Sequence, residues 1–563
     1  MAQSIRPPDD VPPGTPIAVS TRSTAELNTG DWRTFRPVFV TRDSPCNLDC
    51  PAGTDVRRFL QQAADGDAMG AWLTILERNP FPGVCGRVCY HPCEAGCNRA
   101  SFDEAVAVHA IERAIADAVR PRGVIPPLPR ARTGKCVAVI GAGPAGLSCA
   151  YHLARRGHEV TVYDEGDEPG GMLRYGIPAY RLPRHVLDEE IEAVRAMGVC
   201  FVSGTRVGDA VSWDALRAFD AIFLAMGLQR SRSLGIEGER LAGVRPALEV
   251  LREANAGRLP AFTGRVIVIG GGNTAIDAAR VARRAGAPVA VVYRRSRDHM
   301  SAHPDEVRQA EAEGIEIVCD AVPLRVLARD GRAGGVLFQR TRPGEPDASG
   351  RPRPEPIPGA TFGVACAAVL TAIGEELDAN GVSALVDVVQ GRLDAEGGRP
   401  ASRSGSPAVF AGGDAATGAG TVVEAIGSGR RGAEAIDAWI SGAPPTEAVV
   451  ASRVRPKDVN FFYFRRAARA QPAHLKRARA LRGFEEVVGP LVWSDAVAEA
   501  GRCLTCGACT ACGNCVTFCP DAAIAEEPLL GGYAIDLRHC KGCGICVIEC
   551  PRSAMMLVPE VPR

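Results

Sequence analysis

The sequence predicts an α/β protein of several domains, on three observations. The chain has 563 residues, a length that folds as about three or four domains. A β-branched run, a glycine-rich turn, a helical stretch and a second β-branched run follow one another twice, from residue 135 and from residue 264. The 21 cysteines gather mainly in residues 46–97 and 503–550. The middle therefore predicts strand–helix–strand domains, and the two ends predict small cysteine-dependent domains.

The amino-acid composition narrows the class of protein to which the chain can belong. Lys+Arg and Asp+Glu are balanced at 65 each, which gives no reason to expect a nucleic-acid partner. No apolar run approaches the ~18 residues of a membrane-spanning helix, so no membrane insertion is predicted. The start, MAQSIRPPDDVPPGTPIAVS, is proline-rich and lacks a basic-then-apolar pattern. We predict a flexible arm over residues 1–30, a cytoplasmic location, and cysteines that bind metal rather than form disulfides.

The first repeated unit reads KCVAVIGAGPAGLSCAYHLARRGHEVTVYDE. Its turn has the spacing G-x-G-x-x-G, which lets the backbone approach a pyrophosphate on the positive end of the following helix. Asp164 closes the second strand, where a carboxylate can accept hydrogen bonds from ribose hydroxyls. The residues predicted here to bind a dinucleotide are Gly141, Gly143, Ala145, Gly146 and Asp164.

The second unit, GRVIVIGGGNTAIDAARVARRAGAPVAVVYRRS, has Ala275 at the third glycine position. Its second strand ends in Arg294 and Arg295, and guanidinium groups bind a 2′-phosphate that a carboxylate would repel. We therefore predict NADPH, with NADH as an alternative. A solvated strand end is the less favoured interpretation of the two arginines. The predicted nucleotide-binding residues are Gly270, Gly271, Gly272, Asn273, Thr274, Arg294 and Arg295.

Two dinucleotide folds in one chain indicate a flavin and a nicotinamide. EPGGMLRYGIP has paired glycines suited to close backbone contact, and VFAGGDAATGAGTVVEAIGSGRRGA opens a glycine-rich turn into a helix. We predict FAD domain segments at 131–255 and 377–445, and a NAD(P)H domain at 256–376. The further residues predicted to bind cofactor are Gly171, Leu173, Gly176, Ile177, Arg181, Gly413, Asp414, Thr421 and Val422.

The C-terminal segment repeats C-x2-C-x2-C-x3-C-P, first from Cys509 and again from Cys540. This repeat is typical of the bacterial two-cluster ferredoxin, in which the fourth cysteine of each run serves the other 4Fe–4S cube. We predict an α+β ferredoxin domain over 501–563, with two zinc sites as the alternative. Cys503 and Cys506 precede the repeat, leave its register open and are expected to be structural. One cluster is assigned to Cys509, Cys512, Cys515 and Cys550, and the other to Cys519, Cys540, Cys543 and Cys546.

The segment from Cys46 to Gly432 resembles the small subunit of bacterial glutamate synthase. It is equally similar to the flavin–nicotinamide half of dihydropyrimidine dehydrogenase and to the large subunit of bifurcating NADH-dependent ferredoxin:NADP oxidoreductases. The tail resembles the delta subunit of 2-oxoacid:ferredoxin oxidoreductases. The resemblance implies the disulfide-reductase type of fold, with Asp414 at the ribityl chain and Thr421 to Val423 near the flavin ring. It also implies domain crossovers at LAMG, which ends in Gly227, and at TAIG, which ends in Gly374.

The resemblance also implies a helical iron–sulfur domain over 31–130. The family carries two clusters there and a C-x2-C pair just before the position of Cys46, where this sequence reads FVTRDS. One cluster is therefore expected, on Cys50, Cys89 and Cys93, with Glu112 as an oxygen ligand. Glu112 could instead be an exposed helical residue. The cysteines of the missing cluster, which could substitute as ligands, are Cys46 and Cys97, whereas Cys85 is expected to be unligated.

These features predict an oxidoreductase subunit that passes electrons between NADPH, FAD and iron–sulfur clusters. A hydride carries two electrons and a cube accepts one, so the flavin is placed between them, and no catalytic side chain is assigned. The expected partner is a 2-oxoacid:ferredoxin oxidoreductase catalytic subunit or a soluble ferredoxin. The alternatives are a glutamate synthase small subunit and an electron-wiring module without hydride transfer. Residues 446–500 are expected to form a helical connector, solvated or in contact with the reductase body or a partner.

Overall fold

The computed structural model describes residues 28–120, 131–347, 350–379, 382, 385–394, 407–444, 452–527 and 532–560. Most of the predicted arm, and residues 446–451 of the predicted connector, lie outside these ranges. The chain divides into two compact units. The larger comprises Pro45–Val450 and Arg466–Cys503, and the smaller comprises Met1–Ser44, Ala451–Arg465 and Leu504–Arg563. Each unit is described by itself.

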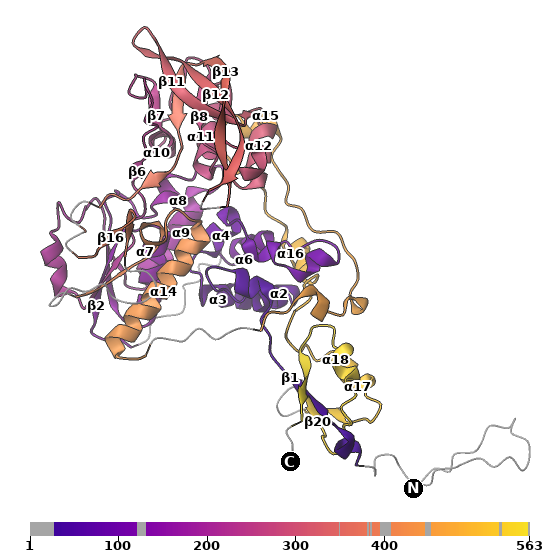
Figure 1. Ribbon diagram of the computed structural model, residues 1–563. Coiled ribbons are helices and arrows are strands. Elements are labelled where there is room, and N and C mark those ends of the chain that lie inside the picture. Colours follow the sequence, from indigo (N-terminus) through magenta and orange to yellow (C-terminus); the bar gives the residue numbers. More distant parts are fainter. Residues whose placement is uncertain are drawn as a thin grey trace, which may run out of the picture. The chain divides into compact units, whose positions relative to one another are not determined.

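The larger unit begins with a small helical region, drawn in indigo and purple in Figure 1. Aspartates start two of its helices, because the side chains of Asp55 and Asp67 accept hydrogen bonds from the N–H groups of Arg58 and Gly70. Its core is aliphatic and aromatic, with Phe59 among its buried side chains. The helices are α1(Pro45–Asp49), α2(Val56–Ala64), α3(Ala68–Leu76), α4(Pro82–Val88), α5(Pro92–Ala95), the 3₁₀ turn η3(Asn98–Ser101) and α6(Val108–Val119).

A five-stranded parallel sheet of order β18-β5-β2-β3-β4 follows. The strands of this sheet are wholly apolar except for one that reads EVTVY, as expected of a sheet covered on both faces. They are β2(Cys136–Ile140), β3(Glu159–Tyr163), β4(Cys200–Val202), β5(Ala221–Leu224) and β18(Ala408–Ala411). The helices of this region are α7(Pro144–Arg155), α8(Met172–Tyr175), α9(Arg184–Ala196), η5(Trp213–Ala218), α13(Asp414–Thr417) and α14(Val422–Ser441).

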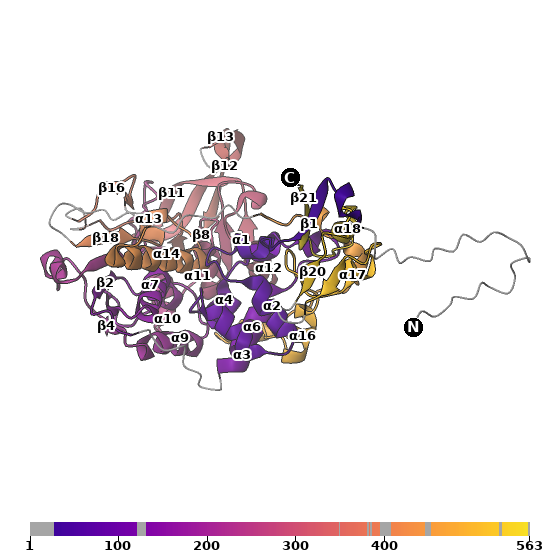
Figure 2. The ribbon, with the colours of Figure 1, turned by 90° about the horizontal axis from the view of Figure 1, so that it is seen from below.

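Helix α14 lies along α7 (Figures 1 and 2). Glycines allow this close packing, since a Cβ at Gly429 would stand 2.0 Å from the Ala145 carbonyl oxygen and one at Gly432 would stand 2.3 Å from the Phe223 ring. The chain thus returns, after the second sheet, to complete the first one.

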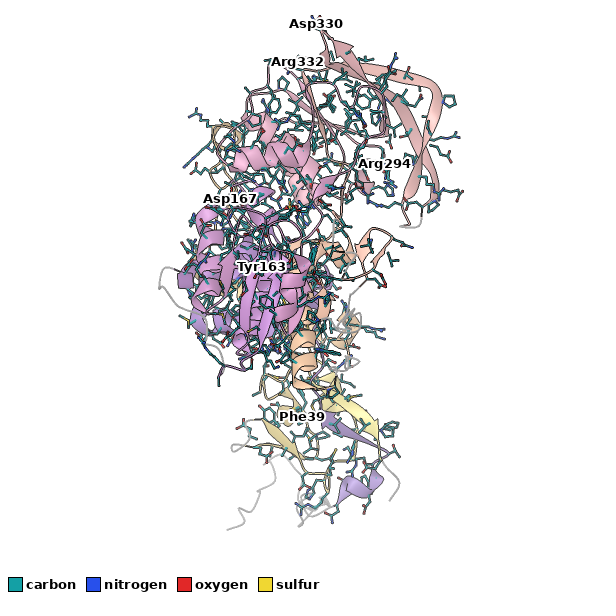
Figure 3. All side chains as sticks on the ribbon, turned by 90° about the vertical axis from the view of Figure 1, so that its left-hand side faces the viewer. Phe39, Tyr163, Asp167, Arg294, Asp330 and Arg332 are labelled. Carbon is teal, nitrogen blue, oxygen red and sulfur yellow. The ribbon has the colours of Figure 1, made fainter. Side chains whose placement is uncertain are left out.

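The second sheet is also parallel, with the order β10-β9-β8-β14-β7. Its strands are β7(Val244–Pro246), β8(Val266–Ile269), β9(Val289–Val292), β10(Glu316–Val318) and β14(Ala368–Thr371). An antiparallel sheet of β11(Ala321–Arg329), β12(Arg332–Pro346) and β13(Pro352–Ala365) stands beside it. Figure 3 shows Asp330 and Arg332 at the tip of this sheet and Arg294 nearer its base. The helical elements here are α10(Ala247–Asn255), α11(Asn273–Arg284), η6(Arg297–His299) and α12(Pro304–Ala312).

The two predicted crossovers between the sheets run side by side. LAMG leads into β6(Arg230–Ser231) and TAIG into β15(Glu375–Glu376), and these two strands pair antiparallel. Gly227 has φ +65° and Gly374 has φ +107°, backbone conformations that favour glycine. A further short pair, β16(Val388–Val389) with β17(Arg392–Leu393), lies between β15 and β18 in the chain.

The connector differs from its prediction. Residues 466–503 contain only the four-residue α15(Arg477–Ala480) and α16(Trp493–Ala500) as helices, and much of the remainder is extended against the helical region. The backbone N–H of Ala467 donates to Asp103 at 3.1 Å, and that of Ala470 donates to Glu499 at 2.9 Å. The segment is thus held by backbone hydrogen bonds to buried carboxylates, which a helical pattern in the sequence does not reveal.

The smaller unit is the ferredoxin domain, and it includes residues from the front of the chain. Strand β1 pairs antiparallel with β21, from Phe35 opposite Pro559 to Phe39 opposite Met555. The boundary predicted at residue 31 is therefore not where the chain divides, because residues 28–44 fold with the tail. The elements are η2(Thr29–Trp32), β1(Phe35–Phe39), η8(Pro456–Asp458), η9(Phe461–Tyr463), α17(Asn514–Thr517), β19(Ile524–Glu526), β20(Tyr533–Ile535), α18(Ile545–Ile548) and β21(Met555–Pro559).

Candidate cofactor-binding site

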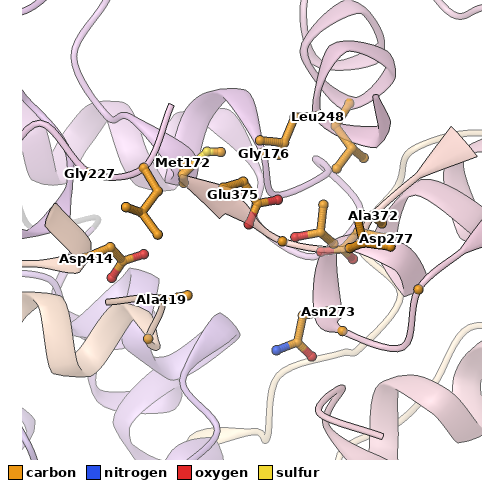
Figure 4. A pocket seen from close by; sticks show the side chains of 18 of the residues that line it. Met172, Gly176, Gly227, Leu248, Asn273, Asp277, Ala372, Glu375, Asp414 and Ala419 are labelled. Atoms are coloured by element: carbon orange, nitrogen blue, oxygen red, sulfur yellow. The ribbon is translucent and has the colours of Figure 1, made fainter. Parts of the chain in front are cut away.

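One cavity of about 1390 Å³ joins the two parallel sheets of the larger unit. Figure 4 shows residues of both sheets facing it, among them Asp414 and Asn273. Of the residues predicted to bind cofactor, only Gly146 and Leu173 do not line it, and both are buried. Those that line it are Gly141, Gly143, Ala145, Asp164, Gly171, Gly176, Ile177, Arg181, Gly227, Gly270, Gly271, Gly272, Asn273, Thr274, Arg294, Arg295, Gly374, Gly413, Asp414, Thr421 and Val422.

The first glycine turn leaves a cradle at the N-terminus of α7. Gly141 has φ +107°, and a Cβ at Gly146 would stand 1.9 Å from the Gly141 carbonyl oxygen, so helix and strand meet without side chains. At Gly143, by contrast, a Cβ would meet nothing nearer than Gly171 Cα at 4.0 Å. No side chain caps the helix start at Gly143. Its free N–H groups and this open space fit a pyrophosphate.

Asp164 lies at the end of β3, as predicted, beside this cradle. One of its carboxylate oxygens accepts from the Ala142 N–H at 2.5 Å and the other from the Gly166 N–H at 2.7 Å. Burial raises the pKa of Asp164, and these two hydrogen bonds oppose the shift. The carboxylate therefore holds the turn in place and still lines the cavity.

The N-terminus of α14 forms another wall. Thr421 caps it in a reciprocal arrangement, in which the Thr421 N–H donates to the Glu424 carboxylate at 2.7 Å and the Glu424 N–H donates to the Thr421 hydroxyl at 3.4 Å. Asp414, at the start of α13, faces the same space (Figure 4). Burial, with the nearby charges of Glu375 and Glu424, raises the pKa of Asp414 to about 6 although Gly420 donates to it.

The second glycine turn repeats the first. Gly270 has φ +147° and approaches the Ala372 carbonyl, and α11 begins at Gly272 without a side-chain cap. Asn273 fixes the next loop by accepting the His303 N–H at 2.9 Å. The second helix N-terminus that reaches the cavity is thus also free to bind a phosphate group.

The predicted arginine pair has two different roles. Arg295 is buried, and its guanidinium donates to Asp347 at 2.6 Å and to the Pro352 carbonyl at 2.8 Å. Arg294 is exposed at the cavity edge. Burial and the neighbouring cations Arg295 and Arg351 lower the pKa of Arg294. Arg351 also lines the cavity and is close enough to Arg294 to influence its pKa, and it was not predicted.

Arg181 also differs in role from its prediction. Its buried guanidinium lies 2.8 Å from an Asp277 oxygen and 3.1 Å from a Glu306 oxygen, and it donates to the Tyr90 hydroxyl at 3.0 Å. These partners come from the helical region and from α11 and α12, so Arg181 ties the two sheets to the helical region. It lines the cavity, and its two terminal nitrogens donate to Asp277 and Tyr90.

Glu375 is a further cavity residue that sequence reasoning missed. It follows TAIG directly, and burial raises its pKa, with Arg232 opposing the shift. An acidic residue directly after a crossover glycine was the available signal. Arg351 gave no comparable signal, because a turn between β12 and β13 brings it to the cavity from more than fifty residues after Arg294.

The front cysteines divide between two cores. Burial raises the pKa of the Cys50, Cys89 and Cys93 thiols, and their mutual charges add to the shift at Cys93. The charge of Glu112 also raises the pKa of the Cys50 and Cys89 thiols, so Glu112 lies near both of them. It is half-buried and accepts from Asn79 at 3.1 Å, and burial raises its pKa to about 8. Cys50, Cys89, Cys93 and Glu112 therefore lie within electrostatic reach of one another.

In the smaller unit, the tail cysteines form two groups related by the sequence repeat. A cavity is lined by Cys519, Cys540, Cys543 and Cys546, which is the predicted second set. In the other group, burial raises the pKa of Cys515 to about 11, and Cys509, Cys512 and Cys550 contribute. Cys506 packs instead with Val454, Val459 and Leu504. This arrangement favours the repeat that starts at Cys509 over the shifted register.

The residues that the structure describes hold no group of three or more His, Cys, Asp or Glu side chains in position to bind one metal ion. No described helix is both long and apolar enough to cross a membrane. The cytoplasmic location stays a prediction.

Three models of known protein families match parts of this chain. The family model of pyridine nucleotide-disulphide oxidoreductases matches residues 135–429, just over half of the chain. The chain belongs to this family. A model of dihydropyrimidine dehydrogenase domain II with its 4Fe-4S cluster matches residues 38–124, and a 4Fe-4S dicluster model matches 508–555. This pyridine nucleotide-disulphide oxidoreductase therefore has the predicted fold class, and its predicted cofactors, FAD, NAD(P)H and 4Fe–4S clusters at the front and in the tail, are confirmed.

Several relatives of this oxidoreductase are subunits. The beta subunit of the NADP(+)-dependent formate dehydrogenase of Moorella thermoacetica is 40% identical over 84% of this chain and 71% of its own length. The beta subunit of the NADPH-Fe(3+) oxidoreductase of Geobacter sulfurreducens is 42% identical over 60% of this chain, which spans only 51% of that relative. The small chain of the NADPH glutamate synthase of Halomonas elongata is 37% identical over 58% of this chain and 73% of its own length. The chain is thus an NAD(P)H-dependent flavin and iron–sulfur oxidoreductase of the electron-transfer subunit type.

Proposed function

We propose that this chain passes electrons between NADPH and a partner catalytic subunit, through FAD and its iron–sulfur clusters. The observation that carries the proposal is the single cavity lined by both glycine turns. Two dinucleotides bound at opposite sheets would meet in this shared space, as hydride transfer requires.

The FAD half is proposed to use backbone groups more than side chains. The open space at Gly143 and the uncapped start of α7 receive the pyrophosphate, and Asp164 holds the turn and accepts from the ribose. Asp414 lies where it can hydrogen-bond the ribityl chain. The start of α14 at Thr421 directs its positive end toward the ring, where it stabilises added negative charge. Bound FAD supplies the exchange between a two-electron hydride and single electrons.

The nicotinamide half is proposed to select NADPH by charge. The start of α11 receives the pyrophosphate, and Arg294 with Arg351 meets the 2′-phosphate. Arg181 keeps α11 and α12 at a fixed place relative to α8 and the helical region.

The proposed ligands of the front cluster are Cys50, Cys89, Cys93 and Glu112. The electrostatic influence of these groups on one another supports this assignment. The tail clusters, on the two groups of four cysteines described above, then exchange single electrons with the partner. Two chemical classes are proposed for that partner. One is a 2-oxoacid:ferredoxin oxidoreductase-like subunit, as the tail predicts, and the other is a formate dehydrogenase catalytic subunit, in line with the similarity to the Moorella thermoacetica beta subunit.

Steady-state dye reduction tests the proposal. The chain, purified anaerobically with its cofactors, should reduce methyl viologen with NADPH, and reduced viologen should in turn form NADPH. A preparation with full FAD and iron content that does neither would overturn it. Purification from the native host with an affinity tag, followed by assays with a 2-oxoacid and with formate, separates the two partner classes.

A second candidate is the small subunit of a glutamate synthase, which the match to the Halomonas elongata small chain favours. That match covers 58% of this chain, whereas the ferredoxin domain at residues 508–555 supplies two further clusters. A large amidotransferase subunit in the same purification, with glutamine-dependent oxidation of NADPH, would support this second candidate instead.

A further inference from the structure

Three cysteines outside the proposed clusters share one core of the larger unit. Cys46, Cys97 and Cys503 are each half-buried and pack against the apolar core of the helical region. Cys85, the remaining cysteine of the front group, is instead 1% exposed and belongs to the core of the first parallel sheet. Cys89 packs against this sheet core as well, so Cys46, Cys97 and Cys503 share the helical core with Cys50 and Cys93 but not with Cys85 or Cys89.

Helix α16 carries Cys503 to this place. It packs on α2 and α6, and Ala500 at its end is buried in the same core. The Cys503 N–H then donates to the Ala500 carbonyl at 2.9 Å, so the turn after the helix fixes the backbone of Cys503. A packed helix end of this kind holds a thiol in one position, as a metal ligand requires.

A buried ionic network ties Cys503 to the neighbourhood of Cys97. Arg99, two residues after Cys97, donates to the Arg502 carbonyl and binds Asp103 at 2.7 Å. Arg502 in turn lies 3.2 Å from Asp103 and 2.6 Å from Glu499. Both arginines are buried. Four charged side chains thus fix the segment that ends in Cys503 against the segment that begins with Cys97, at a cost in desolvation that a solvated linker would not require.

Cys46 approaches the same place from α1. This helix packs on α5, and Cys46, Cys93 and Cys97 all belong to the same apolar core. Cys97 follows Cys93 by one turn, since its N–H donates to the Glu94 carbonyl at 3.1 Å. Cys46 and Cys97 therefore flank the α5 turn that also supplies Cys93.

We propose that Cys46, Cys97 and Cys503 bind a second 4Fe–4S cluster of the helical region, next to the one on Cys50, Cys89 and Cys93. The sequence has no cysteine in residues 1–45, so a second front cluster needs a thiolate from elsewhere, and the turn after α16 supplies it in Cys503. The cluster adds to the proposed electron route, which itself requires only one front cluster.

Iron counting on the full chain tests this site. After anaerobic reconstitution with iron and sulfide, the wild type should hold about 16 iron and as many acid-labile sulfides per FAD, in four cubes. Cys503→Ser should lose about four of each and keep its FAD. Cys85→Ser is the matched control, since it removes a buried front thiol on the other core and should lose none.

A double variant gives the sharper result. Cys46→Ser with Cys503→Ser should lose the same four irons as either single variant, because both residues serve one cluster. Cys50→Ser with Cys503→Ser should lose about eight. Full iron retention in Cys503→Ser, or a doubled loss in the Cys46 and Cys503 pair, would overturn the proposal.

FAD content and thermal unfolding show whether each variant folds, and Cys97→Ser replaces Cys503→Ser if that variant does not. The electron paramagnetic resonance signal of the dithionite-reduced protein should lose one spin-coupled centre in step with the iron. Dye reduction tests the proposed function separately. A chain that reduces viologen but holds only three clusters would overturn the proposal of a fourth cluster and leave the proposed function standing.

Discussion

The two parallel sheets of the larger unit start from the same sequence pattern and differ at two positions. Both first glycines approach the backbone of the following crossover, where a Cβ at Gly141 would stand 2.4 Å from the Ala225 oxygen and one at Gly270 would stand 2.1 Å from the Ala372 oxygen. The third position is Gly146 in one turn and the fully buried Ala275 in the other. The shared glycines thus build the fold, and the differing positions adapt each sheet to its own ligand.

The second difference is the charge at the strand end. Asp164 faces its own turn and accepts two backbone N–H groups, whereas Arg294 stands exposed with Arg351 nearby. One sheet therefore uses a carboxylate to shape the loop that meets its cofactor, and the other presents cations to the cofactor itself. A glycine fingerprint thus locates a nucleotide-binding site, and the residues after the second strand decide which nucleotide binds there.

Replacing Gly146 tests the first difference with the largest expected effect. Gly146→Val would place Cβ 1.9 Å from the Gly141 oxygen, which should cost about 3 kcal/mol and lower FAD occupancy at least about tenfold. Absorbance of the flavin per chain measures it. If the variant retained full FAD, the close approach of helix and strand would not be what requires this glycine.

Arg294→Glu tests the second difference. Losing a charge-assisted contact to a 2′-phosphate and adding a repulsive charge should raise the KM for NADPH about 100-fold, while that for NADH changes little because it has no such phosphate. Steady-state dye reduction with each nucleotide gives both values. Equal effects on the two nucleotides would refute the proposed role of Arg294.

Arg295→Met sharpens the same comparison, because Arg295 is bonded to Asp347 rather than exposed. Its loss should lower the free energy of unfolding by about 2 kcal/mol, since Asp347 is partly solvated. The ratio of KM values for NADPH and NADH should stay near that of the wild type. Chemical denaturation and the same kinetic assay report the two quantities, and a change in selectivity without a loss of stability would reverse the roles of the two arginines.

Ala275→Gly is the smallest change and the counterpart of Gly146→Val. A glycine in α11 should cost about 1 kcal/mol through helix propensity and lost packing, with FAD and NADPH binding retained. Thermal unfolding of the holoprotein measures the cost. A loss of NADPH binding in this variant would show that the methyl group of Ala275 shapes the nucleotide turn directly.

Local patterns predicted much of the site. Gly143, Asp164, Gly272 and Asp414 lie at strand ends or helix starts, where short sequence spacing fixes the geometry, and all of them line the shared cavity. Gly146 was also placed by spacing, although it supports the turn from behind. The tail repeat likewise gave both cysteine groups, including the exchange of the fourth ligand.

Contacts between distant segments could not be predicted. Nothing near Arg181 in the sequence indicates Asp277 or Glu306, and nothing near Arg294 indicates Arg351. Strand β1 reads FRPVF, which has no clear strand pattern, and only its pairing with β21 shows that it completes the ferredoxin domain. The extended connector depends on single backbone hydrogen bonds to buried carboxylates such as Glu499, which have no periodicity to detect.

The order of the redox centres is tested most directly by NADPH titration of Cys543→Ala under anaerobic conditions. This variant should lose about four irons from one tail cluster, and NADPH should still bleach the flavin to the wild-type extent while viologen reduction falls sharply. Flavin that no longer responds to NADPH in a preparation with full FAD content, or viologen reduction at the wild-type rate, would contradict electron flow from NADPH through FAD to the tail.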